Sequence, residues 1–108
     1  MQTPTDISIA AKRWFQKSYG NTYHRVHVLV EYADKTRKLL DSGIHYGYDE
    51  QYIQTAIEEM IKHGVLEDTG KSMDYWPFSL WCENNGVKLH TLVADVNRER
   101  ELKTFVLA

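Results

Sequence analysis

The stretch YGYDEQYIQTAIEEMIKHG, residues 46–64, contains its own start, period and stop signals for one long helix. Asp49 can cap the N–H groups of the first turn, and Glu50 suits the positive end of the helix dipole. Gly64 supplies the left-handed residue that ends the helix. Apolar residues recur three and four apart along one face, namely Tyr52, Ile53, Ala56, Ile57, Met60 and Ile61. A helix with one apolar face predicts a sheet beneath it.

The length and composition favour one globular domain over residues 1–108, with residues 1–5 as a frayed end. Hydrophobic residues make up 43% and charged residues 26%, which is typical of a globular protein and excludes a disordered chain. No apolar run approaches the roughly 20 residues of a membrane-spanning helix, and the N-terminus lacks the features of a signal peptide. A lone cysteine, Cys82, cannot form an internal disulfide, so we expect a cytoplasmic protein that contacts no membrane.

Four segments alternate apolar and polar residues with the period of two that is typical of strands. They span residues 6–16, 23–32, 38–46 and 87–96, and Gly43 weakens the third. The short SYGNT connection predicts a hairpin of the first two strands. WPFSLWCENNG, residues 76–86, predicts a short second helix whose aromatic side chains close the core or form an interface. The sequence therefore predicts an α+β fold of order β-β-β-α-α-β, an antiparallel sheet of three to four strands with one long and one short helix on one face.

Residue chemistry gives no sign of an active site. His24 and His27, three apart on a strand, point to opposite faces and cannot chelate one ion. Cys82 lacks the electropositive surroundings of a reactive thiol and is expected to be a buried apolar residue. The chain has neither a nucleophile elbow nor a glycine-rich phosphate loop. We therefore expect no enzyme, no catalytic residue, no metal site and no cofactor.

The hairpin segment KRWFQKSYGNTYHR, residues 12–25, interleaves cations with aromatic rings. Rings stack on nucleobases and cations bind phosphates, so this pattern is typical of single-stranded nucleic-acid binding. Cross-strand packing explains the same alternation, and a pI near 6.2 disfavours a dedicated nucleic-acid binder. The residues that would form this alternative site are Arg13, Trp14, Lys17, Tyr19, Tyr23 and Arg25.

Residues 49–83 contain eight acids against two lysines, a balance of −6. A solvated helix face accounts for most of these charges. A shared negative surface would instead attract a basic protein partner. The residues that would form this acidic surface are Asp49, Glu50, Glu58, Glu59, Glu67, Asp68 and Asp74.

Three stretches, KRWFQKSYGNTYHRVHVLV, YGYDEQYIQTA and LWCENNGVKLHTLVADVNRERE, together resemble a family of short proteins from bacteriophages and mobile elements. In that family a glycine commonly follows the second tyrosine of YGY, where this chain has Asp49. The resemblance implies a phage setting and carries over no catalytic residues. By analogy with small phage proteins that lack enzyme motifs, it implies an anti-CRISPR-like inhibitor of a host defence complex.

The leading hypothesis is a phage-type binding protein that inhibits a host protein or ribonucleoprotein defence complex by contact, in the host cytoplasm. The alternative is the single-stranded nucleic-acid binder. A third hypothesis, an undetected hydrolase or nuclease, rests only on five histidines and fifteen acids. A homodimer is a further candidate, supported by the apolar TFVLA end, residues 104–108, and by an exposed hairpin edge.

Overall fold

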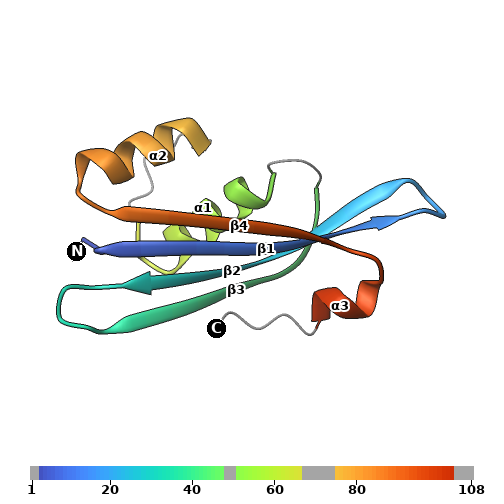
Figure 1. Cartoon of the computed structure of the whole chain (residues 1–108), viewed down its shortest axis with the longest axis horizontal. Coiled ribbons are helices and arrows are strands. Elements are labelled where there is room, and N and C mark those ends of the chain that lie inside the picture. The colour runs from blue at the N-terminus through green and yellow to red at the C-terminus, as the bar shows by residue number, and fades with distance from the viewer. Residues whose placement is uncertain (1–2, 48–50, 67–74, 104–108) are drawn as a thin grey trace.

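A computed structural model describes residues 3–47, 51–66 and 75–103 of the chain. These residues form one four-stranded sheet and three helices (Figure 1). This confirms the α+β class and the predicted order of the six expected elements, and a third helix that was not predicted follows β4. The strands are β1 (Asp6–Gln16), β2 (Asn21–Glu31), β3 (Arg37–Tyr46) and β4 (Lys88–Val96), in the spatial order β3-β2-β1-β4. The helices are α1 (Gln51–Lys62), α2 (Tyr75–Asn84) and α3 (Glu99–Lys103).

The predicted N-terminal hairpin is confirmed. β1 and β2 pair antiparallel without interruption from Asp6 opposite Glu31 to Gln16 opposite Asn21. Gly20 closes the turn with a φ of 69°, a conformation that glycine adopts without steric cost. β3 continues antiparallel on the other side of β2, with an irregularity in register between Arg25 and His27.

The expected all-antiparallel sheet is wrong at β4, which runs parallel to β1 from Lys88 beside Asp6 to Val96 beside Trp14. The physical reason is the path of the chain between β3 and β4. Through α1 and α2 it returns along one face of the sheet to the end where β1 begins, so β4 must enter in the same direction as β1 (Figure 1). The sheet is therefore mixed, with β1 at the parallel junction.

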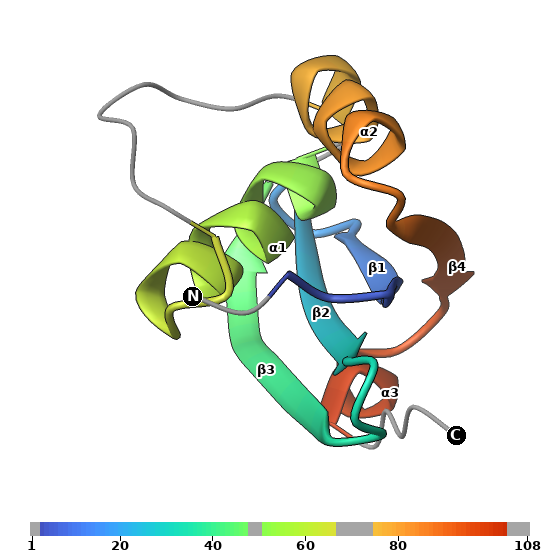
Figure 2. The ribbon, with the colours of Figure 1, turned by 90° about the vertical axis from the view of Figure 1, so that its left-hand side faces the viewer.

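Both α1 and α2 lie on one face of the sheet, as predicted (Figure 2). Alternation along β2 directs Val26, Val28 and Val30 toward this face, and all three are buried. The apolar stripe of α1 packs against them, with Tyr52, Ile53, Ala56, Ile57 and Met60 buried and Ile61 partly buried. Gly64 ends the helix with a φ of 76°. The predicted cap, Asp49, lies outside the described residues.

The second helix places part of its aromatic content in the core. Phe78 is fully buried, and its ring stacks on that of Trp81 at a centroid distance of 6.3 Å. Cys82 is buried one turn further on, as expected, and this burial raises the pKa of its thiol to about 11. The chain turns at Gly86, whose φ is 67°, before it enters β4.

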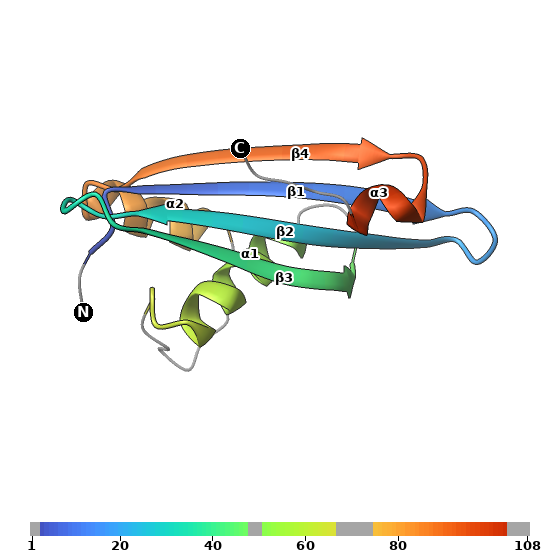
Figure 3. The ribbon, with the colours of Figure 1, turned by 90° about the horizontal axis from the view of Figure 1, so that it is seen from below.

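A third helix, α3, packs on the opposite face of the sheet from α1 and α2 (Figure 3). It begins where the Glu101 carboxylate accepts hydrogen bonds from the backbone N–H groups of Asn97 and Arg98, at 2.9 and 3.3 Å. Its Leu102 is fully buried. The Lys12 ammonium donates to the Glu101 carbonyl, and an Arg25 N–H donates to the Leu102 carbonyl, so two strands hold the end of this helix.

We expect Phe78→Ala to lower the free energy of unfolding by about 3–5 kcal/mol, because it leaves a cavity in a packed core. Leu80→Ala in the same helix is the matched control, since Leu80 is 48% exposed. It should change the unfolding free energy by no more than about 0.5 kcal/mol. Urea denaturation followed by circular dichroism measures both. Equal effects of the two substitutions would contradict this packing of α2.

Candidate binding face of the sheet

The face of the sheet away from α1 and α2, called the open face below, carries every second residue of each strand, except in β3, where the irregular register places Asp41 and Ile44 on it three positions apart. Strand register arranges these residues in rows that cross the sheet from β3 to β4. The rows are Leu39–Leu29–Ser8–His90, Asp41–His27–Ala10–Leu92, Ile44–Arg25–Lys12–Ala94 and Tyr46–Tyr23–Trp14–Val96. The last two of these rows lie at the end of the sheet where α3 packs.

Large apolar side chains are exposed along the two edge strands of this face, whereas Ala10 and His27 on the central strands are buried. Leu39 is 58% exposed, Ile44 42% and Tyr46 62%, all on β3, and Leu92 on β4 is 66% exposed. Of the large hydrophobic residues that are exposed in the described part of the chain, only Phe15, Tyr19 and Leu80 lie elsewhere. A cluster of exposed apolar residues on one face is typical of an interaction surface.

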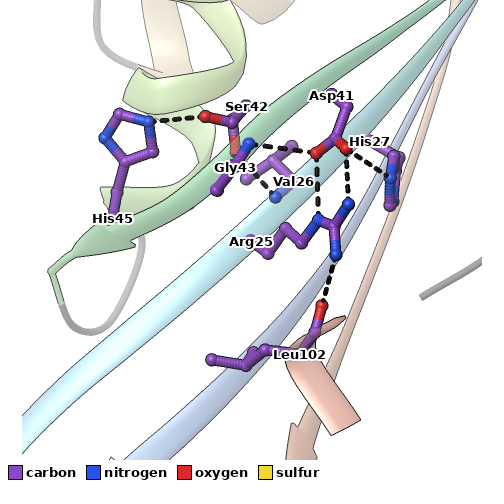
Figure 4. A network of polar contacts seen from close by, with 8 residues as sticks. All are labelled: Arg25, Val26, His27, Asp41, Ser42, Gly43, His45 and Leu102. Atoms are coloured by element: carbon purple, nitrogen blue, oxygen red, sulfur yellow. Dashed lines mark hydrogen bonds and ion pairs between the residues drawn. The ribbon is translucent and has the colours of Figure 1, made fainter. Parts of the chain in front are cut away.

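Arg25 is the centre of the polar contacts on the open face (Figure 4). Its guanidinium donates to both carboxylate oxygens of Asp41, with Nε 3.0 Å from Oδ1, and its remaining nitrogen donates to the Leu102 carbonyl at 2.9 Å. Hydrogen bonding to Asp41 raises the pKa of Arg25. The same contact holds the pKa of the Asp41 carboxyl well below its usual range. Arg25 thus joins β2 to β3 and to α3.

His27 lies next to this ion pair, with its Nε2 3.5 Å from Asp41 Oδ2. Burial lowers its pKa from the ordinary 6.5, and the Asp41 carboxylate opposes this shift without overcoming it. The ring is therefore mainly neutral at pH 7, which leaves Arg25 as the cation that balances Asp41. The Arg25–Asp41 pair on the open face is therefore already neutral before any partner binds.

Aromatic rings form one end of the open face. Trp14 and Tyr23 stack with centroids 5.9 Å apart, and Tyr46 meets Tyr23 edge to face at 5.7 Å. Beside them lies a depression of about 220 Å³. It is lined by Trp14, Gln16, Tyr23, Ile44, Glu99 and Leu102. Its walls combine apolar and polar side chains, and its small size suits a single large side chain of a partner protein.

The predicted opposite orientation of the two N-terminal histidines is confirmed. His24 points to the α1 side, where its ring nitrogens lie 3.1 Å from the Gly47 carbonyl and 2.7 Å from Thr55 Oγ1. Burial lowers the pKa of His24, so this ring is a neutral link between β2 and α1. Among residues 3–47, 51–66 and 75–103, no group of three His, Cys, Asp or Glu side chains is placed to hold a metal ion.

The six residues predicted for nucleic-acid binding do not share one surface. Arg13 lies on the α1 side and donates to both oxygens of Asp95, at 2.8 and 3.3 Å. Trp14, Tyr23 and Arg25 lie on the open face, and Arg25 is paired with Asp41. Lys17 and Tyr19 are exposed at the hairpin tip. The structure therefore divides the set into three places.

The acidic set is described only in part. Glu58 is exposed on α1, and Glu59 lies with a carboxylate oxygen 3.4 Å from His63 Nε2. Both belong to the helix that covers the far side of the sheet from the open face. The other five predicted residues, Asp49, Glu50, Glu67, Asp68 and Asp74, lie outside the described residues.

Sequence reasoning missed the residues that make up the open face. Leu39, Asp41, Ile44 and Leu92 were assigned to strands, and no function followed from that assignment. Alternation along the strands could have identified this face. Residues on the solvent side of a sheet are usually polar, but β3 has Leu39 and Ile44 there and β4 has Leu92. Register across four strands was needed to show that these residues share one face, with Leu92 on the opposite edge strand from the other three.

Comparison with protein-family models, with curated proteins and with solved structures finds no match to this chain. No helix of the described residues has the length and apolar character needed to cross a membrane. The site must therefore be interpreted from its own geometry.

We expect Asp41→Asn to lower the stability of the folded protein near neutral pH and to have little effect in acid. The folded pKa of Asp41 lies below the ordinary 3.8, so its ionised form stabilises the protein above about pH 4. That contribution is lost as the pH falls toward the folded pKa, because the unfolded chain binds the proton first. Urea denaturation from pH 7 to pH 2 measures the difference between variant and wild type. A difference that stays constant over this range would contradict the Arg25–Asp41 pairing.

Proposed function

We propose that the chain is a small binding protein that occupies the surface of a partner protein with its open face and catalyses no reaction. The observation that supports this most directly is the exposure of Leu39, Ile44, Tyr46 and Leu92 on one side of the sheet. A rigid sheet loses little conformational entropy on binding, so burial of these side chains contributes to affinity with little offset. Tyr46 and Arg25 on this face are also of residue types that binding hot spots favour.

The ion pair at the centre of this face suits contact with a protein. Arg25 already has Asp41 and the Leu102 carbonyl as partners, so a docking surface need not supply an opposite charge. An unpaired charge at the same place would carry a large desolvation cost when covered. The face thus combines apolar anchors with a neutralised centre, and an apolar patch with few free charges would complement it.

The choice of partner rests on the sequence resemblance of residues 12–30, 46–56 and 80–101 to proteins of bacteriophages and mobile elements. On that basis we propose a host protein or ribonucleoprotein defence complex as the partner, with inhibition by occlusion in the host cytoplasm. The acidic surface stays a separate prediction, since Glu58 and Glu59 belong to the helix on the other side of the sheet.

We expect expression of the wild-type chain to restore plating of a targeted phage on at least one strain of a panel that carries active CRISPR–Cas systems. Leu39→Glu should abolish this effect, because it places a charge among the apolar anchors. Leu80→Glu is the matched control, an exposed leucine on α2 that should retain full activity. Plating efficiency relative to a defence-deficient strain is the measurement.

Binding to the purified defence complex is the companion measurement. Leu39→Glu should weaken affinity by about tenfold or more, because it replaces an apolar anchor of the proposed interface with a charge. If wild type leaves plating unchanged across the panel, the anti-defence role is wrong. If Leu39→Glu and Leu80→Glu behave alike in both assays, the open face is not the binding surface.

Single-stranded nucleic-acid binding remains the second proposal, because Trp14, Tyr23 and Arg25 do lie together on the open face. We expect oligonucleotide binding, if this proposal holds, to quench tryptophan emission in wild type and much less in Trp14→Leu. The binding should weaken steeply with added salt, since phosphate contacts release counterions. Unchanged emission with a series of oligonucleotides at low salt would refute this alternative.

A further inference from the structure

α3 lies on the open face, beside the aromatic rings at one end of the sheet (Figure 3). The Lys12 ammonium donates to the Glu101 carbonyl at 3.1 Å, and an Arg25 N–H donates to the Leu102 carbonyl at 2.9 Å. The first bond comes from β1 and the second from β2, and the Leu102 side chain is fully buried. The strands therefore fix the position of α3 next to the aromatic end of the face.

The segment that contains α3 carries three exposed cations. The side chains of Arg98, Arg100 and Lys103 are exposed, and none of them makes a hydrogen bond or ion pair with the described part of the chain. Of the two carboxylates in this segment, that of Glu101 accepts the backbone N–H groups at the start of the helix. Glu99 has no such partner among the described residues, and it lines the depression beside the rings. A surface with more cations than carboxylates attracts an anionic ligand.

The depression of about 220 Å³ has walls of two kinds. Trp14 and Tyr23, stacked at 5.9 Å, give it an aromatic wall, and Gln16 and Glu99 give it a polar one. Aromatic rings on the open face of a four-stranded sheet are the surface on which one class of RNA-binding domain stacks its bases. A flat base with a polar edge and an attached phosphate matches the rings, the polar wall and the cations together.

We propose that this end of the open face binds single-stranded nucleic acid, with one base in the depression and the adjoining phosphates on α3. The inference rests on the second proposed function and gives it a site. α3 supplies the phosphate contacts that the two hairpin arginines do not, since Asp95 and Asp41 already pair with those arginines. Leu39 and Leu92 stay uncovered because they lie in other rows of the face. The same face can therefore contact both the RNA and the protein of a ribonucleoprotein.

The Glu99 carboxylate determines which base fits best. A carboxylate only accepts hydrogen bonds, and covering it without a donor is costly. Guanine presents two adjacent donors, the N1–H and the N2 amino group, to one carboxylate. Uracil presents a single N–H between two carbonyl oxygens, which a carboxylate repels. An arginine of a partner protein would also satisfy Glu99, but the three exposed cations around it oppose a cationic ligand. Guanine is therefore the expected base.

Salt dependence tests the role of α3. We expect the wild-type chain to bind a labelled uridine hexamer with one central guanosine, measured by fluorescence anisotropy. The double variant Arg98→Gln with Arg100→Gln should bind more weakly and should reduce the slope of log affinity against log salt by about 1 to 1.5, since each lost phosphate contact releases fewer counterions. Arg37→Gln with Lys88→Gln is the matched control. It removes two exposed cations at the other end of the sheet and should leave the slope unchanged.

Base preference tests the role of Glu99. The wild-type chain should bind the hexamer with a central guanosine about fivefold or more tightly than one with a central uridine, as expected for a bidentate contact to a base edge. Glu99→Gln should lose most of this preference, because an amide presents only one acceptor. Glu83→Gln, at an exposed carboxylate on α2, is the control and should keep the preference. Each substituted side chain is exposed, so the circular dichroism spectra should match that of the wild type.

The outcomes separate this site from the function on which it rests. If the wild-type chain binds none of the hexamers at low salt, the second proposed function is wrong and this site falls with it. If it binds them, but the α3 variant and its control have the same salt slope, the site on α3 is wrong and nucleic-acid binding still stands. A guanosine preference that is absent, or that persists in Glu99→Gln, would overturn the assignment of the base.

Discussion

The alternation of side chains along β2 is the constraint on which the rest of the structure depends. With a period of two, Val26, Val28 and Val30 all fall on one side and are completely covered by α1 and the core. The same period commits Arg25, His27 and Leu29 to the other side, where α3 covers only one end. A shift of one residue would exchange the two sets and bury the arginine under α1, so the register is strongly specified.

The polar contacts on the open face follow from this division. Arg25 cannot reach the core, and it instead ties β3 and α3 to β2 through Asp41 and the Leu102 carbonyl. Asp41 in turn accepts the Gly43 N–H at 3.0 Å, close to where the pairing of β2 and β3 is irregular. One ion pair thus fixes the place where the edge strand bends. The apolar side chains around it are held on a sheet whose shape is set before any partner arrives.

The sequence predicted the elements better than their assembly. Local signals such as the stripe of α1, Gly64 and the alternation in β2 are short-range, and each is confirmed. The direction of β4 depends on how two helices return the chain across the sheet, which no local pattern encodes. The open face was missed for the same reason. Leu39 and Leu92 are 53 positions apart in sequence, and only the register of four strands places them on the same face.

Pairing between distant residues also explains why the basic and aromatic residues of the hairpin do not form the single cationic surface that the sequence predicted. Arg13 and Arg25 look alike in the sequence, yet alternation sends them to opposite sides, where Asp95 and Asp41 neutralise them. Neither carboxylate is near its arginine in the chain. Counting cations along a segment therefore overstates the charge that a folded surface offers to phosphate.

The central claim is that one face of the sheet is sealed by helices while the other displays apolar side chains to solvent. Methyl NMR in the presence of a neutral soluble spin label tests it most directly. The account predicts strong broadening of the Leu39 and Ile44 methyl signals and almost none for Val26, Val28 and Val30. Equal protection of the two sets would contradict it, since the open face would then be covered within the chain itself.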